Sequence, residues 1–169
     1  MEKNVIDHKM VFGIGPSPFW MRTKESADYF AIRCPVATTL GDGSRIFCKT
    51  GGRAWIVAPS CTEVFPVWAR GTATCVLLDK CCIFEWATLN IRLVSCGFNP
   101  CDWIVPTLSQ LQSAYTCRTF WDPSGYAYWS STELSASTAN NINWSSGTLC
   151  GTCCKTCGFY VRAIRCVTY

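Results

Sequence analysis

The middle of the chain reads DWIVPTLSQLQ from Asp102 to Gln112. Within it, Thr107 follows a proline and precedes an apolar residue, and Gln110 stands three residues further on, which is the pattern of a helix capping box. Apolar residues then recur every three or four positions, so they share one helical face. The sequence therefore predicts a short helix over residues 108–116.

The regions on either side of this helix have different signals. Upstream, Gly-rich pairs precede two apolar runs, residues 45–49 and 54–58, and this pattern predicts a β-hairpin. Residues 72–94 are free of Gly and Pro and predict another helix. After Pro123 the chain is rich in Ser, Thr, Asn, Tyr and Trp, which predicts antiparallel strands ending in a strand over 159–167. We expect an α+β fold in which the first and last strands pair.

The first part of the chain carries few periodic signals. Glycines and prolines at Gly13, Gly15, Pro16 and Pro18 interrupt any regular element. We therefore expect an irregular N-terminal arm over residues 1–38, followed by one domain over 39–169. The arm is either a loop that packs on the domain or a segment that docks on a neighbouring subunit.

Three stretches in this order resemble one known family. DWIVPTLSQLQ is similar to the DWRLPT signature of the C-terminal domain of Lcl-type, collagen-like bacterial adhesins. YWSSTE, from Tyr128 to Glu133, is similar to the YWSST motif of that family, and FYVRAIRCV, from Phe159 to Val167, resembles its closing YVRCVR strand. The likeness spans about residues 41–167.

The resemblance implies a C-type-lectin-like fold, with two helices and antiparallel sheets, in which a long loop region carries the binding surface. Relatives of that fold occur in bacterial adhesins, phage tropism proteins and formylglycine-generating enzymes. This sequence departs from the family at Ile104 and Val105, where Arg-Leu is usual, and in the insertion of Ala163 and Ile164. Its cysteine content is not a trait of the family either, so the ligand is less secure than the fold.

Composition narrows the class of protein. The 169 residues are 49% hydrophobic, 14% aromatic and only 15% charged, which is typical of an ordered chain. A net charge of +4 is spread thinly, so we expect no nucleic-acid partner. No apolar run approaches the roughly 20 residues that cross a bilayer, so we expect no membrane span.

Fourteen cysteines are unusual for a chain whose first ten residues lack the pattern of a secretory signal. The cysteines are disulfides formed late, metal ligands, or reduced apolar residues in the core. We favour late disulfides, because a virus particle that is made in the cytosol and released by lysis would supply this history. The expected location is therefore the virion, with other virion proteins and further copies of the chain as partners, in part through inter-chain disulfides.

Particular cysteines suggest particular bonds. The candidates for disulfides are Cys75, Cys81, Cys82, Cys96, Cys101, Cys117, Cys150, Cys153, Cys154, Cys157 and Cys166. A bond from Cys166 to Cys75, Cys81 or Cys82 would resemble the bridge from the first helix to the last strand of the lectin-like fold. The spacing of Cys150 to Cys157 also suits tetrahedral zinc or a redox pair, but we expect disulfides there and no metal or other cofactor.

A binding surface is predicted in the strand-rich half. The candidate ligand-binding residues are Trp129, Asn140, Asn141, Asn143 and Trp144, since aromatic faces stack on sugars and amides hydrogen-bond to them. The alternative for both tryptophans is core packing. The Glu-Pro-Asn, Gln-Pro-Asp and Trp-Asn-Asp motifs of calcium-dependent animal lectins are missing, and calcium needs several charged oxygens, so we expect no calcium.

We expect no catalysis, because His8 is the one histidine and none of the usual catalytic or phosphate-binding motifs occurs. The leading hypothesis is a non-enzymatic structural or decorating protein of a tailed-phage virion. The first alternative is an adhesin module that binds glycans or a host surface. The second is an intracellular zinc or redox protein.

Overall fold

The computed structural model describes residues 24–68, 86–121, 123 and 125–169. Its helices are α1 (Lys24–Arg33), α2 (Trp86–Ser95) and α3 (Leu108–Thr116), with short 3-10 turns η2 (Ser60–Thr62), η3 (Pro100–Asp102) and η4 (Arg118–Phe120). Its strands are β1 (Arg45–Thr50), β2 (Arg53–Val57), β3 (Ala127–Glu133), β4 (Thr138–Asn143), β5 (Leu149–Cys154) and β6 (Ile164–Thr168). The predicted α+β class is confirmed.

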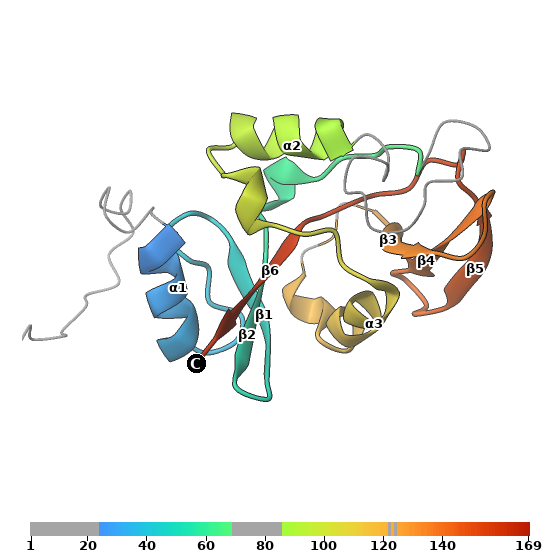
Figure 1. Cartoon of the computed structure of the whole chain (residues 1–169). Helices are drawn as coiled ribbons and strands as arrows, with labels where there is room; N and C mark the ends of the chain where they lie inside the picture. The colour runs from blue at the N-terminus through green and yellow to red at the C-terminus, as the bar shows by residue number, and fades with distance from the viewer. Residues whose placement is uncertain (1–23, 69–85, 122, 124) are drawn as a thin grey trace, which may run out of the picture.

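The strands form two antiparallel sheets of three, in the orders β1-β2-β6 and β3-β4-β5. In the first sheet, β6 pairs with β2 from Arg53 opposite Thr168 to Val57 opposite Ile164. The end of the chain therefore closes on its first hairpin, as expected. Figure 1 shows the two sheets side by side, with α3 between them and α1 at the outer side of the first sheet.

Local sequence signals account for the hairpin and for α3. Gly51 and Gly52 have positive φ values of 55° and 70° at the turn between β1 and β2, where most other residues would be strained. At the start of α3, the Thr107 side chain accepts a hydrogen bond from the backbone of Gln110, whose side chain accepts one from the backbone of Thr107. The predicted helix and its capping box are both confirmed.

Three expectations need correction or fall outside the described residues. The irregular arm over 1–38 is wrong for Lys24–Arg33, because α1 contacts β2 and β6 and buries Ala31 in the core. The helix expected over 72–94 corresponds to α2, which runs from Trp86 to Ser95. The prediction for residues 72–85 falls outside the described residues. The last strand begins at Ile164 rather than 159, because the chain crosses between the sheets there and makes only isolated bridges, such as Val161 with Val64.

The buried apolar residues form two clusters on opposite faces of the first sheet. Ala54 and Ile56 of β2 belong to one cluster together with Ala31 of α1. Val57 of β2 belongs to the other, together with Leu111 of α3. Trp129 of β3 joins the first cluster and Tyr128 the second, so the core runs on from one sheet to the other.

Candidate functional site

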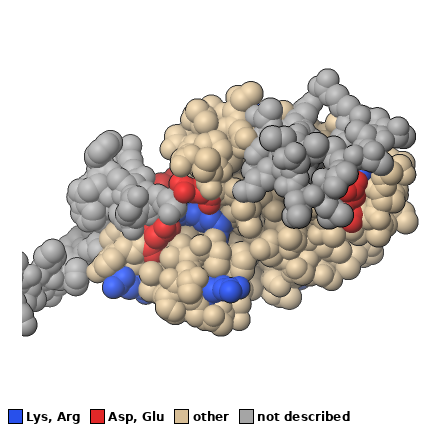
Figure 2. All heavy atoms as spheres, viewed as in Figure 1, with Lys and Arg blue, Asp and Glu red and all other residues tan. Residues whose placement is uncertain are grey.

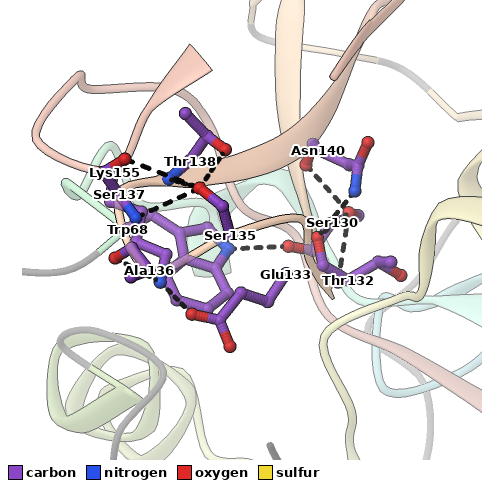
Figure 3. Close-up of polar contacts among 10 residues, drawn as sticks. All are labelled: Trp68, Ser130, Thr132, Glu133, Ser135, Ala136, Ser137, Thr138, Asn140 and Lys155. Carbon is purple, nitrogen blue, oxygen red and sulfur yellow. Dashed lines mark hydrogen bonds and ion pairs between the residues drawn. The ribbon is translucent and has the colours of Figure 1, made fainter. Parts of the chain in front are cut away.

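A lysine directly after the last strand of the second sheet is buried together with its carboxylate partner. The Lys155 side chain has no exposed surface, and its Nζ forms an ion pair with Glu133, whose side chain is 13% exposed. Nζ also donates to the carbonyl of Ala136 at 2.9 Å and lies 4.6 Å from the ring centroid of Trp68. Figure 3 shows these contacts beside the hydroxyls of the β3–β4 turn. The arrangement neutralises a buried ammonium and fixes three chain segments.

Arg162 is a second buried cation, and it links chain segments between the two sheets. Its Nε donates to the carbonyl of Ala58 at 2.7 Å, and an Nη donates to the carbonyl of Trp121. Glu63 lies 3.7 Å from the guanidinium and accepts a 2.6 Å hydrogen bond from the hydroxyl of Tyr128. Burial and this bond to Glu63 raise the pKa of Tyr128, so its proton stays on the hydroxyl at neutral pH.

Arg165 ties α1 to β6. Its Nη1 lies 2.8 Å from a carboxylate oxygen of Asp28, and its Nη2 lies 3.4 Å from one of Asp42. The guanidinium also lies 5.1 Å from the ring centroid of Trp103. In Figure 2 the charged atoms form small separate groups, and most of the described surface on this face is neither acidic nor basic. Buried charges in this chain therefore hold segments of the fold together.

The two tryptophans predicted to bind a ligand lie in the core. Trp129 is fully buried and packs against Phe159, with ring centroids 4.7 Å apart. Trp144 is 4% exposed and packs against Trp121, also at 4.7 Å. Of the two interpretations weighed for them, core packing is the one that the structure favours, because neither ring presents a face to solvent. The prediction that these two tryptophans form an exposed binding patch is wrong.

The predicted asparagines have structural contacts as well. Asn140 is buried and donates from Nδ2 to the carbonyl of Thr132 at 3.1 Å. Asn143 accepts backbone hydrogen bonds from Ser145 at 2.9 Å and Ser146 at 3.1 Å, which fixes the turn after β4. Asn141 is also buried, and its Nδ2 makes no full hydrogen bond within the described part of the chain. Within the described residues, the indole N–H groups of Trp129 and Trp144 have no hydrogen-bond partner either, so Asn141 shares its spare donor capacity with both tryptophans.

An open groove of about 300 Å³ lies between the β1–β2 hairpin and α3, which is the lower end of the size range of small-ligand pockets. The half-buried ring of Trp55 and the exposed guanidinium of Arg53 come from β2, and the side chain of Gln110 comes from α3. Sequence reasoning missed this groove, in part because the predicted strand began at residue 54 and left out Arg53. In β2, Arg53 and Trp55 lie two residues apart and so share one face of the strand. Its lining is Phe47, Cys48, Thr50, Gly51, Arg53, Trp55, Ser109, Gln110 and Ser113.

Two cysteine pairs bring distant parts of the chain together. Cys48 of β1 lies beside Cys117, the residue that follows α3, and their thiols hydrogen-bond. Cys61 of η2 lies beside Cys96, whose Sγ also donates to the carbonyl of Cys61 at 3.4 Å. The pKa of Cys48 and the pKa of Cys61 are each raised to about 11. Burial is the larger cause, and the hydrogen bond with the partner thiol is the second. Cys48 and Cys61 were absent from the predicted disulfide set.

The other disulfide candidates are placed as follows. Cys75, Cys81 and Cys82, the partners expected for Cys166, lie outside the described residues. Cys166 is exposed on β6, and Cys101, Cys154 and Cys157 are exposed thiols too. Cys150 and Cys153 are half-buried on β5 and hydrogen-bond to each other. Within the described residues, potential metal ligands do not gather in groups of three or more.

No protein-family model and no curated protein sequence significantly matches the chain. Among the described residues, none of the helices is both long and apolar enough to cross a membrane.

Proposed function

We propose that this chain is a non-enzymatic domain with a C-type-lectin-like fold that serves as a structural or decorating protein of a virus particle, such as a tailed phage. In this role it holds and contacts other virion proteins and further copies of itself. The pairing of β6 with β2 supports the lectin-like arrangement, because it joins the end of the chain to its first hairpin across both intervening helices.

The observation that carries the proposal is the placement of the two cysteine pairs. Cys48 with Cys117 joins β1 to the end of α3, and Cys61 with Cys96 joins η2 to the end of α2. Oxidation of each thiol pair to a disulfide would stabilise the fold by roughly 2–4 kcal/mol. Disulfides persist at virion surfaces and other oxidising places. A scaffold that is cross-linked after release from the cell fits this chemistry.

The assembly is tested by measuring the molar mass of the full-length chain in solution by light scattering after chromatography. The oxidised chain is expected to elute as an oligomer, part of which separates into monomers when a reductant is added. Exposed thiols such as Cys101 and Cys166 are available for inter-chain bonds. A monomer under both conditions would contradict the proposed self-assembly.

The groove favours a second candidate function, the binding of a saccharide with a carboxylate group. The ring of Trp55 offers a face on which a sugar can stack, and the guanidinium of Arg53 matches a carboxylate in charge and geometry. Gln110 uses its Oε1 in the capping box at 2.8 Å, which leaves its NH₂ group to donate to a hydroxyl. Such binding would let the domain recognise a host surface.

Calorimetric titration of the full chain with oligogalacturonate tests this second function. Arg53→Gln is expected to lose most of the affinity, while Arg92→Gln, which removes an exposed arginine from α2, is expected to leave it unchanged. A wild-type chain that fails to bind, or an Arg53→Gln chain that binds equally well, would contradict the saccharide site.

A further inference from the structure

The Cys150-Gly151-Thr152-Cys153 stretch of β5 contains a β-bulge. Cys150 lies opposite Asn141 of β4 and Cys153 opposite Ala139, so two residues of β5 oppose one of β4 between these pairs. In a regular strand, residues three apart point to opposite faces. The extra residue instead places Cys150 and Cys153 on the same face, where their thiols make contact.

The two thiols differ in their surroundings. The pKa of Cys150 is lowered, because the Cys153 thiol and then the backbone N–H of Thr152 donate hydrogen bonds to its thiolate. Burial, followed by the hydrogen bond to Cys150, raises the pKa of Cys153 to about 11. At neutral pH Cys150 is therefore the better nucleophile, and Cys153 keeps its proton until a reaction changes its neighbour.

A buried amide is aimed at this pair. Asn141 is 2% exposed, and its Nδ2 faces the sulfur of Cys153, whose thiolate it stabilises. Nδ2 has no hydrogen-bond partner of normal geometry within the described part of the chain, so its N–H groups can donate to a charged sulfur. Such a donor helps the second cysteine of a dithiol pair to ionise when it must attack.

We propose that Cys150 and Cys153 form a thiol–disulfide exchange site whose substrate is a small solvent-accessible disulfide. The Cys150 thiolate attacks one sulfur of the substrate, a new S–S bond forms, and the other substrate sulfur leaves as a thiolate that takes a proton from solvent. The Cys153 thiol then loses its proton to solvent and attacks Sγ of Cys150, and the second substrate thiolate leaves and is protonated. The protein dithiol is oxidised, and the substrate is reduced to two thiols.

This site goes beyond the proposed structural function, which does not depend on it. Each dithiol reacts once and is left oxidised, so the exchange is stoichiometric and the domain remains non-enzymatic. The site differs in kind from the two pairs that join distant elements, because its cysteines belong to one strand and one of them has a lowered pKa. Oxidation of Cys150 and Cys153 therefore forms a bond within one strand, whereas oxidation of the other pairs cross-links distant elements of the fold.

The test uses the reduced full-length chain with oxidised glutathione as the probe, followed by acid quenching and peptide mass spectrometry. The wild type is expected to form the Cys150–Cys153 bond, and Cys153→Ser is expected to accumulate a mixed disulfide of glutathione on Cys150. Cys154→Ser, which removes an exposed thiol of the same strand, should behave as the wild type. Glutathione spread evenly over Cys150, Cys154 and Cys157 would overturn the proposal.

A second measurement keeps the proposal open to refutation if a variant does not fold. Alkylation of the wild-type chain by iodoacetamide, followed residue by residue against pH, should reach half its maximal rate at a lower pH for Cys150 than for Cys154. At pH 7 Cys150 should react several-fold faster, because more of it is thiolate. Equal pH midpoints for the two residues would overturn the assignment, and would leave the structural proposal untouched.

Discussion

The two sheets of this domain share the apolar core but differ in how their outer parts are held. The first sheet, β1-β2-β6, lies between two apolar clusters, with α1 against one face and residues of α3 against the other. The second sheet, β3-β4-β5, is a local meander whose last strand is mostly exposed or half-buried, and it ends beside the buried pair of Lys155 and Glu133. Apolar burial thus closes the long-range sheet, whereas one ion pair fixes the edge of the local one.

The largest effect is expected from breaking the ion pair. Glu133→Gln leaves the ammonium of Lys155 buried without its counter-ion, which should lower the free energy of unfolding by about 3–5 kcal/mol. Hydrogen exchange should become faster in β3-β4-β5 and stay slow in the β2–β6 pairs. Urea unfolding measures the first effect and mass spectrometry the second.

A double variant serves as the control for that result. Glu133→Leu combined with Lys155→Met removes both charges and should recover most of the stability, because an apolar pair avoids the cost of burying ions. A loss below about 1 kcal/mol for Glu133→Gln alone would mean that the ion pair does not hold the second sheet.

The next effect concerns the cysteine pairs around the first sheet. In the oxidised chain, Cys48→Ser and Cys61→Ser should each lower the stability by roughly 2–4 kcal/mol. In the reduced chain the same changes should have little effect. Cys48→Ser with Cys117→Ser should be no worse than Cys48→Ser alone. Losses of equal size with and without reductant would show that packing, and not a bond, accounts for them.

A smaller effect is expected at α3, which contributes to the core beside both sheets. Thr107→Ala removes the side-chain oxygen that accepts from the Gln110 backbone, so it should cost about 1 kcal/mol. Thr107→Ser keeps that oxygen and should be close to the wild type. Thermal unfolding compares the three chains, and equal stability of the alanine variant would contradict the role of the capping box.

The last effect is a loss of stability at alkaline pH that is expected for the reduced chain. The pKa of Cys48 and that of Cys61 are raised to about 11 in the folded chain, above the ordinary value of about 8.5 for an unfolded thiol. The folded state therefore holds these protons longer, and its stability should fall as the pH rises from about 8.5 to about 11. In the oxidised chain these thiols are gone, so the fall should be much smaller there. The comparison of the reduced wild type with reduced Cys48→Ser and Cys61→Ser separates these two thiols from Cys153, whose pKa is also raised to about 11.

Much of the fold could be predicted because its signals are local. The capping box at Thr107 and Gln110 fixes the start of a helix within four residues, and the glycines after β1 fix a hairpin turn. Helix α1 was missed because its polar sequence, KESADYFAIR, has little periodicity and its place depends on contacts with β2 and β6. Tertiary packing decides such an element.

The site was harder to predict for the same reason. The strand pattern could not show that Trp129 is buried, since β3 has core clusters on both of its faces and buries neighbouring residues alike. Trp144 directly follows β4, and its burial depends on contacts with distant residues such as Trp121. The cysteine pairs were missed because their members are far apart in sequence, and spacing alone does not reveal such partners. The Cys150 to Cys153 spacing was visible, but the bulge that brings these thiols together was not.

Peptide mapping of the natively oxidised chain, digested without reductant, tests the account most directly. It should yield peptides that join Cys48 to Cys117 and Cys61 to Cys96, and both should disappear when a reductant is added before digestion. A native chain in which all four of these cysteines are free thiols would contradict the account of a scaffold locked by disulfides.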